Sequence, residues 1–167
     1  MIFVTVGTHE QSFERLTNYM DRWAGEHDEE VVIQLGYTKK EPVNCRFFTM
    51  VSHNEYLRFL NEARIVITHG GPCCFTEVLK SGKIPIVVPR KWKYTEHIDD
   101  HQTVICRKYE KKYGNIILVE NIRTLGKCIE NYDTLTKDMT KGCKESNNEH
   151  FCQELSGIVD KLFSEGE

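Results

Sequence analysis

Short apolar runs and amphipathic segments alternate along the chain. The apolar runs are continuous rather than interrupted at every second residue, which is typical of parallel strands buried on both faces. Strands are predicted at residues 2–6, 31–35, 46–48, 65–67, 84–88 and 116–119. Apolar residues at helical spacing predict helices around residues 13–23, 52–60, 75–80, 98–113 and 122–131. The alternation indicates an α/β fold with a Rossmann-like parallel sheet flanked by helices.

The length of 167 residues suits one packed core and is too short for two nucleotide-binding halves. We therefore expect a single domain over residues 1–167, with its core at about 1–131. The segment 133–148 is rich in Thr, Lys and Asn and is predicted to be a loop. A C-terminal amphipathic helix is expected at about 149–164.

Charge and cysteine content exclude several classes of protein. The formal net charge is -3 and the two signs are mixed along the chain, so the basic stripe of a nucleic-acid-binding protein is absent and no nucleic-acid partner is expected. The seven cysteines are scattered and follow no signal peptide, which predicts reduced thiols in a cytoplasmic protein. No apolar run approaches the ~20 residues that cross a bilayer, so any membrane contact is expected to be peripheral or through a partner.

Two glycine turns follow predicted strands, Gly7-Thr8-His9 near the start and His69-Gly70-Gly71 in the middle of the chain. The carboxyl ends of parallel strands share one edge of a sheet, where open α/β folds bind ligands. A glycine turn that leads into a helix sets backbone amides against a diphosphate. Glu77, near the first turn of the helix that follows, carries a carboxylate that can accept hydrogen bonds from a ribose diol. The pattern predicts a nucleotide-sugar site.

A polar segment, Glu96-His97-Ile98-Asp99-Asp100-His101-Gln102, follows the next strand and is expected to line the same crevice. A basic and aromatic loop, Arg90-Lys91-Trp92-Lys93-Tyr94, lies between that strand and the polar segment. This loop suits either closure over a bound ligand or contact with anionic lipid headgroups, and the alternative is a solvated loop.

These runs, residues 69–89 and 90–102 together with the start at 3–8, resemble the C-terminal half of GT-B glycosyltransferases, the family 28 C-terminal domain. The resemblance is greatest to the catalytic subunits of two-component transferases. These are the PssE-like proteins of bacterial exopolysaccharide and capsule synthesis and the eukaryotic subunit that adds the second N-acetylglucosamine to the dolichol-linked precursor. The resemblance covers the chain from Met1 to about Tyr113.

The resemblance implies a role for each matching residue. Contacts to UDP and its phosphates are implied for Gly7, Thr8, His69, Gly70, Gly71 and Glu77, with Glu77 at the ribose. Contacts to the transferred sugar are implied for His97, Asp100 and Gln102. Cys73 and Cys74 depart from the family pattern, which has small residues such as glycine, serine or threonine there, so a hydroxyl contact to phosphate is lost.

The activity that the resemblance implies is inverting transfer of a hexose or hexose derivative from a UDP-sugar to a polyprenyl-diphosphate-linked saccharide. It implies no cofactor and no metal. The general base would come from a membrane-anchored, acceptor-binding partner subunit, which would also recruit this cytoplasmic chain to the inner face of the membrane. His9 is the local candidate for a catalytic base. Isolated chains are expected to form a homodimer that covers the surface of the missing half.

Two alternatives remain at this point. The chain could be a non-catalytic UDP-sugar-binding module, or a metal-dependent hydrolase that uses His97 and His101. Their i, i+4 spacing would place both imidazoles on one helical face, and the carboxylates of Glu96, Asp99 and Asp100 lie among them. Against the hydrolase, no glutamate occupies the middle of the motif and no third ligand is evident. The transferred sugar is also open between galactose, glucuronic acid and N-acetylglucosamine, with galactose favoured.

Overall fold

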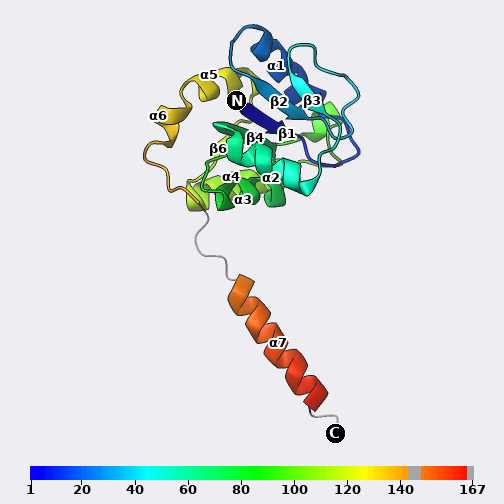
Figure 1. Cartoon of the computed structure of the whole chain (residues 1–167), viewed down its shortest axis with the longest axis vertical. Helices are drawn as coiled ribbons and strands as arrows, with labels where there is room; N and C mark the ends of the chain where they lie inside the picture. Colours follow the sequence, from blue (N-terminus) through cyan, green and yellow to red (C-terminus); the bar gives the residue numbers. More distant parts are fainter. Residues whose placement is uncertain (143–147, 165–167) are drawn as a thin grey trace.

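The fold is built around a parallel six-stranded sheet (Figure 1). The structure is a computed structural model and describes residues 1–142 and 148–164. The strands are β1 (Ile2–Thr5), β2 (Val31–Gln34), β3 (Arg46–Phe48), β4 (Ile65–His69), β5 (Ile86–Val88) and β6 (Ile117–Leu118). Their order in the sheet is β3-β2-β1-β4-β5-β6, and all neighbours run parallel. The prediction of a Rossmann-like α/β fold is confirmed.

Helices cover both faces of this sheet (Figure 1). One face packs against α1 (Glu14–Gly25), α5 (Leu125–Glu130) and α6 (Tyr132–Thr136). The other packs against α2 (His53–Glu62), α3 (Pro72–Lys80) and α4 (His101–Tyr113). Successive side chains of a strand point to opposite faces, so Ile2 and Val4 enter the first core and Phe3 enters the second.

The strand order creates a switch point at the centre of the sheet. From β1 the chain crosses to β2 on one side, whereas from β4 it crosses to β5 on the other side. The loops that follow β1 and β4 therefore diverge and leave a crevice at the carboxyl edge between them. This crevice is where the two predicted glycine turns lie.

Helix α4 begins later than predicted, at His101 rather than at residue 98. The reason is a set of side-chain to backbone hydrogen bonds that compete with helix formation. Asp99 Oδ1 accepts from the backbone N of His101 at 3.0 Å, and Asp100 Oδ1 accepts from the backbone N of Trp92 at 2.9 Å. The preceding loop contains a 3₁₀ turn, η1 (Trp92–Tyr94).

Two other boundaries also differ from the predictions. The helix predicted over 122–131 is divided into the 3₁₀ turn η2 (Ile122–Thr124) and α5. The segment 133–148, predicted to be a loop, starts inside helix α6, because the Tyr132 side chain is buried and its hydroxyl donates to the Ile84 carbonyl oxygen at 2.6 Å. Part of that predicted loop, residues 143–147, lies outside the described residues.

The C-terminal helix α7 (Asn148–Ser164) extends away from the sheet and the helices that cover it (Figure 1). Its described side chains, residues 150–163, are exposed. These include six large apolar residues, Phe151, Leu155, Ile158, Val159, Leu162 and Phe163. In the described ranges, no helix combines the length and the apolar character that are needed to span a bilayer.

Candidate functional site

A cavity of about 530 Å³ lies at the carboxyl edge of the sheet, where β1, β2 and β4 end. Its volume falls within the range of small-molecule sites. Five residues predicted for the site line it together: Gly7, Thr8, His9, His69 and Glu77. Six further residues were not predicted: Thr5, Gln34, Val51, His53, Tyr56 and Cys74. Thr5 and Gln34 are the last residues of their strands. Their place in the cavity could therefore have been predicted from where the strands end.

The imidazole of His69 lies between the two glycine turns. A Cβ atom at either Gly7 or Gly71 would come within 3.0 Å of the His69 ring, a separation that real side chains do not have. Gly7 also has a φ of 75°, which disfavours any other residue. The glycines therefore make room for the His69 ring, which the sequence did not reveal.

Burial keeps His69 neutral. The side chain is almost fully buried, and burial together with the nearby Arg90 charge lowers the pKa of His69 to about 4. Neutral imidazole offers one donor and one acceptor nitrogen rather than a positive charge. A phosphate contact by His69 stays a prediction, and near neutral pH it would be a hydrogen bond and not an ion pair.

Helix α3 begins at the cavity. Gly71 is its N-cap and Pro72 its first residue, so the first turn directs backbone N–H groups toward the cavity end of the helix. Cys74 and Glu77 from this helix line the cavity. Burial raises the pKa of the Cys74 thiol to about 11, with the neighbouring Cys73 and Glu77 adding to the effect. Cys74 is therefore a neutral thiol near pH 7 and not a nucleophile.

Gln102 connects the second glycine turn to the exit of β5. Its Oε1 atom accepts from the backbone N of Gly70 at 3.1 Å and from the backbone N of Arg90 at 3.0 Å. A Cβ atom at Gly70 would lie 2.9 Å from the Gln102 Cβ, so this glycine is also needed for close packing. The side-chain carbonyl oxygen of Gln102 already accepts these two hydrogen bonds. A sugar contact of Gln102, which stays a prediction, would therefore be made by its amide nitrogen.

None of the three predicted sugar contacts, His97, Asp100 and Gln102, lines the main cavity. His97 lines a neighbouring hollow with Gln11 and Trp92. Its ring packs 4.5 Å from the ring of His9 and 4.5 Å from that of His101, measured between centroids. Burial lowers the pKa of His97, and these two histidines add to the effect, whereas Asp99 opposes it.

The Arg90 side chain is fully buried. From the sequence it was assigned to the basic and aromatic loop at residues 90–94, for which exposure was expected. Its guanidinium donates to the carbonyl oxygens of Val6, Gln11 and Glu96 at 2.9, 2.7 and 3.1 Å. Burial lowers the pKa of Arg90 to about 10, and the Glu96 carboxylate opposes that shift, so the group stays cationic at neutral pH. Arg90 thus fixes the turn after β1 against the exit from β5.

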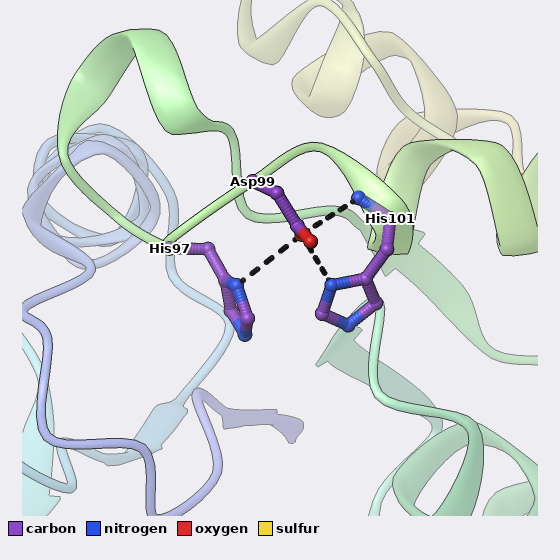
Figure 2. Close-up of side chains that lie close together, drawn as sticks. All are labelled: His97, Asp99 and His101. Carbon is purple, nitrogen blue, oxygen red and sulfur yellow. Dashed lines mark hydrogen bonds and ion pairs between the residues drawn. The ribbon is translucent and has the colours of Figure 1, made fainter.

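The pair His97 and His101 does not share a helical face, because His97 precedes α4. A bend in the chain brings the two side chains together instead, with Asp99 between them (Figure 2). Asp99 is therefore the third potential metal ligand, which the sequence did not distinguish from Glu96 and Asp100. Within residues 1–142 and 148–164, this is the group of ligating side chains whose arrangement suits a metal ion.

Comparison with known proteins gives one finding that bears on this site. Residues 1–161 match the Glycosyltransferase family 28 C-terminal domain. No curated protein matches the chain. The match spans the sheet, both glycine turns and most of α7, so it includes every residue that lines the cavity.

Proposed function

Because the chain belongs to the family of the glycosyltransferase family 28 C-terminal domain, we propose that it is the donor-binding catalytic subunit of a two-component inverting glycosyltransferase. The observation that carries the proposal is the cavity at the switch point, which joins Gly7, Thr8, His69 and Glu77. Open α/β sheets bind nucleotides at this position. The proposed donor is a UDP-sugar, with galactose as the first candidate sugar.

The cavity supports a specific placement of the donor. The diphosphate would lie against the turn at Gly7 and Thr8 and the first turn of α3, whose amides and helix dipole favour negative charge. The Glu77 carboxylate would accept hydrogen bonds from the ribose hydroxyls. The sugar would extend toward Asp100 and Gln102.

In the transfer step, the acceptor hydroxyl oxygen attacks the anomeric carbon while the bond from that carbon to the UDP oxygen breaks, so the configuration inverts. UDP leaves with the bonding electron pair, and the glycine-turn amides stabilise its charge. The acceptor proton goes to a general base. His9 lines the cavity and is the local candidate, whereas the main proposal assigns the base to a partner subunit.

That partner would be a membrane-anchored, acceptor-binding subunit, and the acceptor a polyprenyl-diphosphate-linked saccharide of exopolysaccharide or capsule synthesis. The acceptor is assigned to a partner because the sheet and its cavity correspond to the donor-binding half of a GT-B enzyme. In this scheme the chain is cytoplasmic and reaches the inner face of the membrane through the partner. In isolation it would form homodimers.

Calorimetric titration with UDP and a series of UDP-sugars tests the proposal. We expect UDP binding that is lost in Glu77→Ala and unchanged by a chelator. Glu62→Ala is the matched control, because Glu62 is an exposed carboxylate at the end of α2, away from the cavity. Binding that is equal in both variants would exclude Glu77 from the site and contradict the proposed donor placement.

Turnover then separates the transferase from a non-catalytic UDP-sugar-binding module. The purified chain is combined with membranes that contain the acceptor-binding subunit and a radiolabelled UDP-sugar. Transfer of label to lipid only when both components are present supports the two-component enzyme. Tight UDP-sugar binding without transfer in the combined system supports the binding module.

A further inference from the structure

We propose that His97, Asp99 and His101 bind one divalent transition-metal ion of the zinc class. Each residue offers one ligand atom, and these atoms all lie within 4.8 Å of one another. Two imidazole nitrogens and one carboxylate oxygen form a three-ligand set that zinc accepts, with the remaining position open to water or another ligand. The proposal is separate from the proposed transferase function and does not depend on it.

The side chains already converge on one point. The Nδ1 atom of His97 is 3.7 Å from Asp99 Oδ1, and the Nδ1 atom of His101 contacts the same oxygen. Figure 2 shows both rings with Nδ1 directed at the carboxylate between them. Zinc bonds to nitrogen and oxygen are about 2.0–2.2 Å long, so ligand atoms around a tetrahedral ion lie roughly 3.4 Å apart. Side-chain rotations that move the ligand atoms by roughly 1 Å therefore suffice to admit an ion.

Each ring would exchange a present contact for the ion. The backbone N of Ile98 donates to Nδ1 of His97 at 3.0 Å, so this nitrogen is unprotonated, and an ion bound to it would replace Ile98 as the partner of its single lone pair. The Nδ1 atom of His101 contacts Asp99 Oδ1, and an ion that enters between them would replace this contact. Asp99 and His101 are 56% and 43% exposed at their side chains, so both can adjust to the ion.

The backbone of this segment is held from both ends. Glu96 Oε2 accepts from the backbone N of Lys91 at 2.9 Å, and the Glu96 carbonyl oxygen accepts from the buried Arg90. At the other end, Asp100 binds the backbone N of Trp92. A loop that is fixed at residues adjacent to each ligand keeps the three side chains close without the ion, which reduces the entropic cost of binding it.

Ligand chemistry selects the class of ion. Imidazole nitrogens favour zinc, cobalt, nickel and copper, whereas magnesium and calcium take oxygen ligands almost exclusively. The ion would lie next to the ring pair of His9 and His97, and His9 lines the main cavity. A bound ion would therefore also be a neighbour of any ligand in that cavity.

The test measures metal binding by the full chain and not activity. Cobalt(II) is titrated while its visible absorption bands are recorded, and zinc affinity is measured by calorimetry. We expect one ion per chain with nitrogen and oxygen ligation. Loss of one ligand in His101→Asn or Asp99→Ala should weaken zinc binding on the order of 100-fold or more. Both positions are exposed, so both variants should fold.

A matched control is available on α7. His150 and Glu154 are an exposed histidine and carboxylate 3.8 Å apart, so His150→Asn removes a similar pair without touching the three proposed ligands. Zinc affinity that is unchanged in this variant and lost in the other two supports the site. Absence of zinc binding overturns the proposal, as does binding that survives both His101→Asn and Asp99→Ala, which would place the ion on other groups such as the exposed Cys73 and Cys152. UDP is absent throughout, so these outcomes are distinct from failure of the transferase proposal.

Discussion

Glu96 binds Arg15 through both carboxylate oxygens across 81 residues of sequence. Arg15 Nε donates to Oε1 and Nη2 donates to Oε2, each at 2.8 Å, and the two side chains are only 12% and 3% exposed. Nη2 of Arg15 also donates to the carbonyl oxygen of Pro89 at 2.8 Å. This ion pair joins helix α1 to the loop that carries His97, so the position of that loop depends on it.

Replacing Glu96 by glutamine should therefore destabilise the fold. The change leaves the buried Arg15 charge without its counter-charge, and breaking one side of a buried pair costs about 3 kcal/mol. Glu120→Gln is the control, because its partner Arg107 is 63% exposed and an exposed pair contributes less than about 1 kcal/mol. Urea unfolding of both variants measures the difference. Equal losses would show that burial does not strengthen the Arg15–Glu96 pair.

Alanine at Gly7 should cost more than alanine at Gly82. The two glycines have nearly the same backbone angle, φ of 75° and 80°, so both variants carry a strain of about 1–2 kcal/mol. A Cβ at Gly7 would collide with His69, whereas one at Gly82 meets nothing within 4 Å. We expect an additional loss of roughly 1–3 kcal/mol for Gly7→Ala from overpacking. Thermal or urea unfolding checks this, and similar losses at both positions would contradict a steric role for the His69 ring.

His69 should make the fold less stable in acid. Its pKa in the folded protein, about 4, lies below its ordinary value of 6.5. As pH falls through 6.5 the unfolded chain takes up a proton that the folded protein refuses, so the free energy of unfolding decreases down to about pH 4. The loss from this group should reach about 3 kcal/mol.

His69→Phe isolates this contribution, because phenylalanine keeps a planar ring and does not titrate. Urea unfolding at several pH values between 4 and 7 should give a shallower pH dependence for the variant than for the natural sequence. Carboxyl groups titrate in the same range in both proteins, so only the difference between the two curves is informative. Superimposable curves would mean that the imidazole accepts its proton in the folded state.

The sequence was sufficient for the fold class and for the location of the cavity. The runs 31–33 and 65–67 are apolar throughout, because both sides of each strand are covered by helices, and such runs are recognisable without a structure. The carboxyl ends of these parallel strands lie at one edge of the sheet, and Gly7 lines the cavity at that edge.

Long-range polar contacts explain what the sequence did not show. Arg90 looks like a surface cation next to Lys91, and only its backbone partners on distant segments make a buried position possible. Helix α6 depends in the same way on the hydrogen bond of Tyr132 to Ile84. Asp99 competes with the first turn of α4 through its side chain, and periodicity contains no information on that competition.

The enclosure of His69 between two glycines constrains the order in which this site can change during evolution. Gly71 has φ and ψ of -75° and 121°, angles that any residue tolerates, so the obstacle to a side chain there is the close approach of the His69 imidazole and not the backbone. A lineage could therefore gain a side chain at position 71 only after position 69 has become smaller. The reverse order would pass through a protein in which two groups occupy the same space. Relatives with alanine or serine at 71 should accordingly have a small residue at 69, whatever sugar they transfer.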